Sequence, residues 1–455
     1  MGEYREYREQ LFRDLFSNTV PDRVPIQDNL NIEFMIQYCG LDLMNTQYSY
    51  SDEILDAIFK KITDEVMRGD IFPAMYCRNA VAFMLDGNIA NQMGSNGMIQ
   101  HPEISFMEAD EYDEFIENPF DFLLEKVSTR NSKQFQKGEI FRSRALLMKT
   151  FAIMDQNAML GRAQAKAAAE HELFTEPFGA SAGAQPPFDL IADFCRGFSK
   201  IPLDMRRCPE KLMAAMDAAM PFLLAQSMPS RPNILGASKV MTHMAAFLNT
   251  KQFEKFYFPH FNEMAHINLE RGVHMTMFLE QDWTRFIDML MDMPMGTRFY
   301  MERGDLKEFK EKMGKKFVLG GFYPLEYLRA NDLTACIDKA KEILDVMAPG
   351  GNYFFTWSKS GLALNDINVE NYVGVLEYVR NNSKYDNAGD IVYDCKQSDT
   401  IHKGLMNKYP EFKSKYVIPF DEYKKEYPPI SEAAEPFMRS AYEKYLSKVA
   451  LNRSC

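Results

Sequence analysis

Short apolar runs alternate with longer amphipathic segments through the second half of the chain. The runs are NILGASKVMTH (233–243), VHMTMFL (273–279), TRFYM (297–301), FVLGGF (317–322) and NYFFTW (352–357), and each precedes a segment with helical spacing of its apolar positions. Such repeated units predict parallel strands joined by crossover helices. Their number favours a closed (β/α)8 TIM barrel, an α/β fold, over a short doubly wound sheet.

The first half of the chain predicts mostly helix. Residues 1–22 read as an N-terminal helical extension, RVPI (23–26) as the start of the first strand, and 139–174 as one long helix rich in good helix formers. The Gly-, Ala-, Ser- and Pro-rich stretch 175–189 predicts a loop, and it holds neither a GxGxxG nor a P-loop pattern. We expect 1–455 to be a single barrel domain whose C-terminal extension, 385–455, closes the barrel or makes a homodimer contact.

Composition and charge exclude several classes of protein. The chain has 455 residues, of which 46% are hydrophobic, and a net charge of −12 without a Lys/Arg cluster, so we expect no nucleic-acid partner. No apolar stretch approaches the roughly 20 residues of a membrane-spanning helix, and the charged start is unlike a signal peptide. We therefore expect no membrane partner and a cytoplasmic location. The seven cysteines are scattered without a CxxC pair, which predicts free thiols.

The run HMTMFLEQDW (274–283) ends abruptly in polar residues. In a strand, alternate side chains share a face, so His274, Thr276, Phe278 and Glu280 would lie on one side. Working residues of (β/α)8 barrels sit at the C-terminal ends of the strands, which places Glu280 at the catalytic mouth. The alternative for Glu280 is a helix cap or an ion pair with Arg285.

Other polar residues follow the predicted strands. His243 ends the run VMTH and Glu302 follows FYM, so both reach the same mouth as Glu280. Asp282 and Asp305 are better read as N-caps, and His274, deeper along the strand, as a core histidine. Trp357 and Lys359 end NYFFTW, where they are candidates to bind the substrate.

Several segments resemble the uroporphyrinogen decarboxylase superfamily, which includes the corrinoid-linked methyltransferases of anaerobes. They are similar to its characteristic blocks in the same order over about 280 residues, and Gln281 stands where glycine is usual. The segments are IQHPEISFMEADEYDEFIENPFDF (99–122), FCRGFSKIPLDMRRCPEKLMAAMD (194–217), TKQFEKFYFPHFNEM (250–264) and FLEQDWTRFIDML (278–290).

The resemblance implies a TIM barrel and a choice of chemistries. The decarboxylases hold propionates with an RQAGRY-like stretch, which is missing here; CRNAVAFMLDGN (77–88), with Arg78 and Asp86, is only loosely similar. The thiol-activating methyltransferases carry zinc on His-x-Cys and a later Cys. The corresponding zinc-binding positions of this chain fall near Phe278, Glu280 and Trp357, so the cysteine thiolates are absent.

The remaining branch transfers methyl groups from methoxylated aromatic compounds to a corrinoid protein, as O-demethylases do. By this resemblance we expect Glu280, His243 and Glu302 to be catalytic, and to bind zinc if a metal is present, since zinc accepts Glu and His. The residues expected to bind the substrate are Phe278, Arg78, Trp357 and Lys359. The chain lacks the DxHxxG motif of cobalamin-binding modules, so the corrinoid is expected on a separate protein. A decarboxylase of an aromatic or pyrrolic acid and a non-catalytic binding subunit are the alternatives.

Overall fold

A computed structural model describes residues 2–72 and 78–446, and its contacts divide the chain into two compact units. The sheet unit comprises Met1–Cys77, Ala158–Pro186 and Ser227–Lys408, and the helical unit comprises Arg78–Asn157, Pro187–Gln226 and Tyr409–Cys455.

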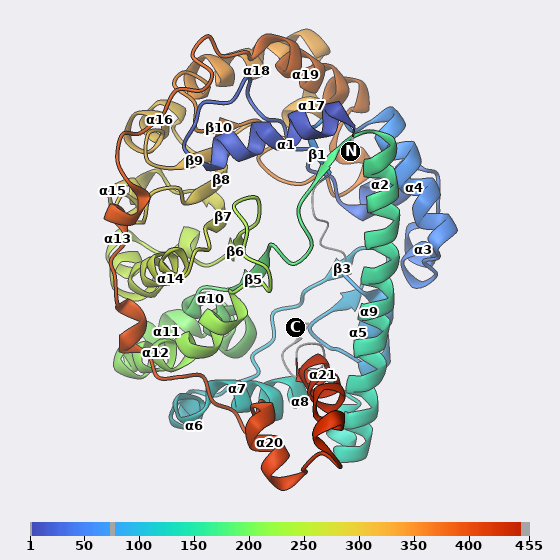
Figure 1. Ribbon diagram of the computed structural model, residues 1–455, viewed down its shortest axis with the longest axis vertical. Helices are drawn as coiled ribbons and strands as arrows, with labels where there is room; N and C mark the ends of the chain where they lie inside the picture. Colours follow the sequence, from blue (N-terminus) through green and yellow to red (C-terminus); the bar gives the residue numbers. More distant parts are fainter. Residues whose placement is uncertain (1, 73–77, 447–455) are drawn as a thin grey trace. The chain divides into compact units, whose positions relative to one another are not determined.

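The sheet unit contains a six-stranded parallel sheet in the order β10-β9-β8-β7-β6-β5 (Figure 1). Its strands are β5 (Ala182–Ala184), β6 (Ser238–Thr242), β7 (Met275–Asp282), β8 (Arg298–Arg303), β9 (Val318–Gly321) and β10 (Tyr353–Phe354). Strands β6 to β10 arise from the five apolar runs, so the prediction of parallel strands is confirmed for this part of the chain.

Further parallel pairings continue beyond β10. Ile26 bridges Phe355, and the next residue, Gln27, bridges Ile71 of β1 (Ile71–Phe72), which pairs in turn with β4 (Phe174–Thr175). The segment RVPI therefore leads into a strand-like stretch, as its sequence predicts. These contacts extend a parallel arrangement from β5 round to β4.

Helices follow the strands in the predicted rhythm. In Figure 1, α14 (Phe258–Glu270), α16 (Leu306–Met313) and α18 (Leu333–Met347) lie along one side of β6 to β10. Asp305 and Asp332 begin α16 and α18, where their carboxylates accept hydrogen bonds from the main-chain N–H groups of Glu308 and Ala335, both at 2.9 Å. This is the N-cap role predicted for Asp305. The remaining helices of the unit include α1 (Glu3–Phe16), α2 (Ile32–Tyr38), α4 (Asp52–Glu65) and α19 (Val369–Asn382).

The two faces of β6 and β7 differ in environment. Val240, Met277 and Leu279 point to one face and are buried. Lys239, Met241, Thr276 and Phe278 point to the other and are partly or largely exposed. The strand period of two therefore separates a packed face from an open one, and the open face carries the side chains that the sequence marked at the end of β7.

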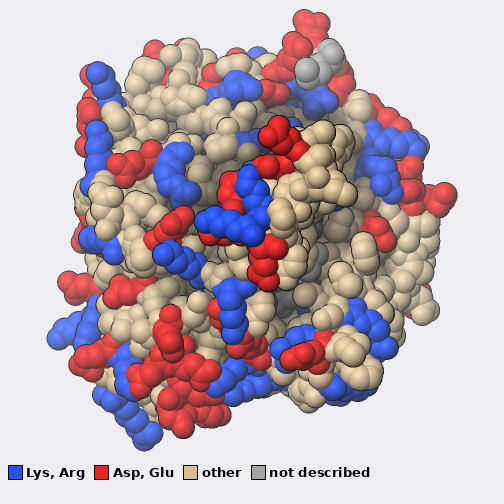
Figure 2. Space-filling view, turned by 60° about the horizontal axis from the view of Figure 1, so that its bottom comes forward, with Lys and Arg blue, Asp and Glu red and all other residues tan. Residues whose placement is uncertain are grey.

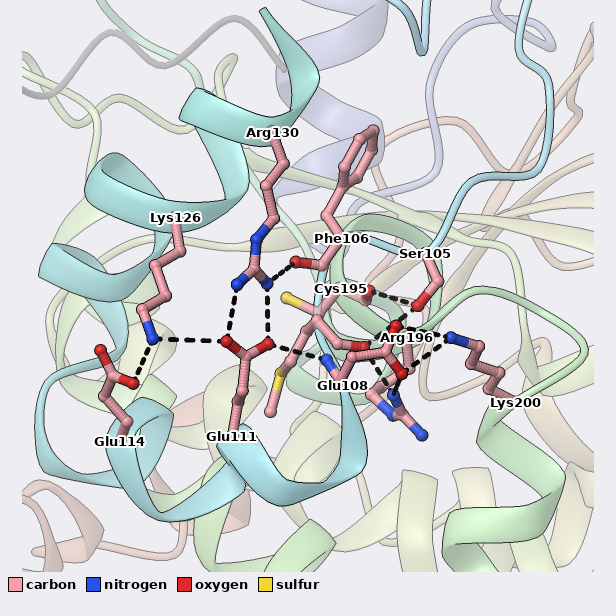
Figure 3. A network of polar contacts seen from close by, with 11 residues as sticks. Ser105, Phe106, Glu108, Glu111, Glu114, Lys126, Arg130, Cys195, Arg196 and Lys200 are labelled. Atoms are coloured by element: carbon pink, nitrogen blue, oxygen red, sulfur yellow. Dashed lines mark hydrogen bonds and ion pairs between the residues drawn. The ribbon is translucent and has the colours of Figure 1, made fainter. Parts of the chain in front are cut away.

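The helical unit is held by buried and half-buried ion pairs. Glu111 accepts two hydrogen bonds from the Arg130 guanidinium, at 2.6 and 2.7 Å, and one from Lys126 at 3.3 Å (Figure 3). These charges lower the pKa of Glu111 to about 2. Arg196 pairs with the buried Asp204 at 2.5 and 3.0 Å and also contacts the Met107 carbonyl. The network ties the loop after β3 (Ile99–Gln100) to α6 (Tyr112–Glu117), α8 (Ser128–Asn131) and α11 (Ile201–Arg207).

Surface and cysteine features agree with the composition. Basic and acidic side chains are interspersed on the face shown in Figure 2. None of the helices in 2–72 and 78–446 is long and apolar enough to cross a membrane. Cys39, Cys195, Cys208, Cys336 and Cys395 are free thiols, whereas Cys77 and Cys455 lie outside the described residues.

The long helix predicted over 139–174 is α9 (Glu139–Glu170).

Candidate functional site

His243 and Glu280 meet at the C-terminal ends of neighbouring strands. His243 follows β6, Glu280 lies near the end of β7, and the imidazole Nε2 is 3.2 Å from Glu280 Oε1. Both side chains are accessible, with exposed fractions of 58% and 31%. The contact fixes the orientation of the imidazole relative to the carboxylate. The two groups therefore lie together at a solvent-accessible strand end.

A β-bulge shapes the end of β7 beside this pair. The register between β7 and β8 shifts between Leu279 and Asp282, and Gln281 adopts a left-handed conformation with φ of +62°. The Gln281 N–H, turned by the bulge, donates a 2.8 Å hydrogen bond to Glu302 Oε2. The indole of Trp283 donates to the Glu280 carbonyl at 2.9 Å. Bulges next to functional sites change the direction of side chains. Here the peptide group between Glu280 and Gln281 donates its N–H to Glu302, so the bulge links the two glutamates.

Arg285 and Asp282, which follow Glu280 in the chain, have structural roles. Arg285 donates to the main-chain oxygens of Ala246 and Leu248, at 2.7 and 3.0 Å, so among the described contacts it anchors the loop after β6 and does not pair with Glu280. Asp282 accepts a 2.8 Å hydrogen bond from the Thr284 N–H and so caps the turn after β7.

His274 is a buried histidine at the start of β7. Its Nδ1–H donates to the Gly296 carbonyl at 3.0 Å, and burial lowers its pKa to about 3. The ring is therefore neutral at physiological pH and belongs to the core.

Aromatic side chains line the open face below the pair. The rings of Phe278 and Tyr300 lie 4.9 Å apart, on adjacent strands. The Tyr300 hydroxyl donates to the Trp357 carbonyl and accepts a hydrogen bond from the Asn29 side-chain amide. Burial raises the pKa of Tyr300 well above its usual value, so the hydroxyl stays protonated. The Phe278 ring is partly exposed on the open face, next to Tyr300.

Asn29 was missed by the sequence analysis, and it belongs to a longer buried network. Its neighbour Asp28 is fully buried and accepts hydrogen bonds from the Gly69 N–H at 2.6 Å and the Tyr372 hydroxyl at 2.9 Å. Burial raises the pKa of Asp28 to about 6. No motif marks these residues. The pairing of Ile26 with Phe355, directly after β10, and of Gln27 with β1 brings them next to Tyr300 and Tyr372.

The Trp357 ring lies in the core. It is fully buried against Tyr323, Phe355 and Tyr372, with ring-centroid distances of 4.9, 5.6 and 4.6 Å. It therefore supports the wall behind Tyr300, and its predicted role in substrate binding stays a prediction.

Lys359 and Arg303 form a charged rim. Glu326 lies 4.0 Å from the Lys359 ammonium and 3.6 Å from the Arg303 guanidinium. Arg303 also approaches Glu302 at 4.0 Å. Glu302 is buried, whereas the two pairs of Glu326 are exposed and loose, so the cations of those two pairs are able to exchange partners.

Arg78 and Asp86 belong to the helical unit. The Arg78 guanidinium donates to the Ile99 carbonyl at 3.2 Å, and Asp86 is buried and paired with Lys149 at 2.7 Å. Both therefore make contacts that stabilise the helical unit.

The proposed zinc ligands do not converge in this structure. Within 2–72 and 78–446, the group of three potential ligands whose donor atoms lie within 4.8 Å of one another is His266, Asp292 and His402, and it does not include Glu280, His243 or Glu302. Zinc requires three or four protein ligands, so the two donors of the His243–Glu280 pair fall short, and no step is derived through zinc.

The group of His266, Asp292 and His402 stabilises the packing of the C-terminal segment of the sheet unit. His266 Nε2–H donates to the Asp292 carbonyl, and its Nδ1 accepts from the His402 N–H, both at 3.1 Å. Because both ring nitrogens are engaged, no lone pair remains for a metal. The His402 ring stacks on His266 with centroids 4.0 Å apart, which fastens the C-terminal segment of the sheet unit to α14.

The fold is similar to that of a solved methyltransferase from Methanosarcina mazei. The TM-score is 0.51 over 82% of this chain and 98% of that one, at 12% sequence identity. No protein-family model and no curated protein matches the sequence. At this identity the likeness concerns the fold alone. It identifies an α/β architecture that a methyltransferase also uses.

Proposed function

We propose that the protein is a methyltransferase of the O-demethylase type, which moves a methyl group from a small methoxylated aromatic substrate to a corrinoid protein. The observation that carries the proposal is the His243–Glu280 contact at 3.2 Å, at the C-terminal ends of β6 and β7 and above the open face. The structural likeness to a methyltransferase supports this class of reaction.

The proposal includes closure of the sheet into a (β/α)8 barrel. Nine parallel stretches follow one another in space, each paired with the next: β5, β6, β7, β8, β9, β10, the 26–27 stretch, β1 and β4. Because β4 and β5 follow each other along the chain, we propose that they occupy one strand position of the barrel. Active sites of such barrels lie at the C-terminal strand ends, which is where His243, Glu280 and Glu302 are found.

The pair is suited to assist the departure of the aryl oxygen. The bond between the methyl carbon and the ether oxygen breaks, the methyl group leaves for the acceptor, and the oxygen keeps the bonding electrons. The developing phenolate takes a proton from the His243–Glu280 pair, so that a phenol is released. Glu302, fixed by the Gln281 N–H, holds the bulge that presents Glu280.

The methyl acceptor is proposed to arrive on a separate protein. A reduced corrinoid supplies a nucleophile strong enough to take a methyl group from an ether. The docking protein would approach the mouth, where Arg303, Glu326 and Lys359 form the charged rim.

The test is a reconstitution with a defined ether. Purified protein is mixed with methoxybenzene, with and without a reduced corrinoid such as cob(I)alamin, and phenol and methylcobalamin are quantified. Phenol should form only with the corrinoid, in equal amount to methylcobalamin. Phenol formation without it contradicts the proposal, and release of carbon dioxide from a pyrrolic or aromatic acid without a corrinoid selects the decarboxylase alternative.

A further inference from the structure

The open face of the sheet is arranged in three layers along the strands. Strand pairing aligns Lys239 with Thr276 and Thr276 with Arg298, and two residues further on it aligns Met241 with Phe278 and Phe278 with Tyr300. Two more residues along are His243, Glu280 and Glu302. The layers are therefore cationic, then apolar and aromatic, then the proposed catalytic layer.

The middle layer is accessible from solvent. Met241 is 59% exposed although it lies in an interior strand of the sheet, and Phe278 beside it is partly exposed. Side chains on this side of a parallel sheet are ordinarily buried. A ring lying over Met241 and against the Phe278–Tyr300 pair would cover apolar surface that the described residues leave open.

The first layer has more positive than negative charge. Lys239, 40% exposed, forms an ion pair of 2.7 Å with Glu176, and Glu176 also acts electrostatically on the buried Arg298. The hydrogen bonds of the Arg298 guanidinium go to the main-chain oxygens of Gly236 and Ile234, at 2.9 and 2.5 Å. One carboxylate thus serves two cations, and a second anion placed here would be stabilised.

From these three layers we propose that the substrate is an aryl methyl ether that carries a carboxylate across the ring from the methoxy group. The carboxylate binds at Lys239, the ring lies over Met241 and Phe278, and the methoxy group meets His243 and Glu280. The orientation of the ether rests on the proposed function, whereas the binding of an aryl carboxylate at Lys239 does not.

The dimensions fit such a molecule. His243 lies four residue steps beyond Lys239, which corresponds to roughly 13 Å between their Cα atoms, and the side chains of a strand stand roughly perpendicular to it. A hydrogen bond at each end takes about 3 Å, which leaves about 7 Å for the ligand. A benzene ring with two para substituents spans that length, whereas a carboxylate and a methoxy group on adjacent ring positions lie too close together to reach both layers.

Calorimetry with two probes tests the assignment of the carboxylate. The probes are 4-methoxybenzoate and the neutral methoxybenzene, measured without any corrinoid, so that the result does not depend on turnover. The wild-type protein should bind the acid at least tenfold more tightly than the neutral ether. Lys239→Gln should lose about tenfold affinity for the acid and keep its affinity for the neutral ether, and Lys239→Arg should retain most of the preference.

Two further variants complete the design. Glu176→Gln frees Lys239 of its partner and should tighten acid binding several-fold, a change opposite in sign to that of Lys239→Gln. Lys251→Gln, at an exposed position of α13 (Thr250–Gln252), is the matched control and should alter neither affinity. Equal wild-type affinities for the two probes, or a parallel loss for both probes in Lys239→Gln, would overturn the inference. If the acid binds as expected but is never demethylated, the proposed function fails and the carboxylate site stands.

Discussion

His243 and Glu280 are in contact at 3.2 Å, although one residue follows β6 and the other lies near the end of β7. Parallel pairing brings the C-terminal ends of β6 and β7 together, and the bulge at Gln281 shapes the end of β7 next to the carboxylate. In the proposed mechanism this pair delivers a proton to an oxygen on the open face.

Replacement of Glu280 by Gln should leave the fold intact and lower kcat about 100-fold or more, because a neutral amide cannot take part in the proposed proton transfer to the aryl oxygen. Phenol release in the reconstituted assay measures the effect, and circular dichroism checks the fold. Glu254→Gln, at an exposed position, is the matched control. Near wild-type turnover in Glu280→Gln would remove this carboxylate from the mechanism.

Gln281→Gly should raise the free energy of unfolding by about 1 kcal/mol. Gln281 has φ of +62°, a left-handed conformation that costs a side-chain-bearing residue roughly that amount and costs glycine almost nothing. Urea denaturation provides the measurement. Gln281→Ala, which removes most of the side chain but keeps the Cβ, should give no comparable gain, so an equal gain in both variants would show that the backbone conformation is not the cause.

Tyr300→Phe should lower the free energy of unfolding by about 1–3 kcal/mol, since it leaves the Asn29 amide and the Trp357 carbonyl without their buried partner. The ring contact with Phe278 is kept. Tyr38→Phe, which removes a hydroxyl bonded to the exposed Glu65, is the comparison and should change stability by less than about 0.5 kcal/mol. Equal effects in the two variants would contradict the buried network.

The two buried histidines His274 and His266 should lower the free energy of unfolding as the pH falls below about 6.5, whereas Asp28, whose pKa burial raises to about 6, contributes in the opposite direction. Burial lowers the pKa of His274 to about 3 and that of His266 to about 4, from 6.5, so in this range each histidine binds more protons in the unfolded chain than in the folded one. Each histidine should contribute a loss of about 2 kcal/mol between pH 6.5 and 4.5. Urea denaturation of the wild type and of His274→Gln at pH 6.5 and 4.5 measures how much the free energy of unfolding of each protein changes with pH. Identical changes in the two proteins would mean that His274 is not held neutral by the fold.

Patterns along the chain were enough for the local features. The apolar runs of β6 to β10, the long helix α9 and the cap at Asp305 were all predicted, since each depends on neighbouring residues and on a period of 2 or 3.6. His274 was correctly read as a core residue for the same reason, because its position deep in an apolar strand determines its burial.

Other features depend on contacts between distant segments. Asn29 and Asp28 were missed because only the pairing of the 26–27 stretch with β10 and β1 brings them to Tyr300 and Tyr372. The burial of Trp357 also depends on such contacts, because Tyr323 and Tyr372, which enclose its ring together with Phe355, come from other segments of the chain.

By itself, the sequence determined the parallel strands and helices and the carboxylate and imidazole at their ends, because strand alternation and helix capping act over a few residues. The tertiary structure alone decided which of these groups meet. Strand register set the three layers over Lys239, Met241 and His243, and the bulge connected Glu302 to the end of β7. Register and bulges arise from pairing between strands far apart in the chain, and no local pattern encodes them.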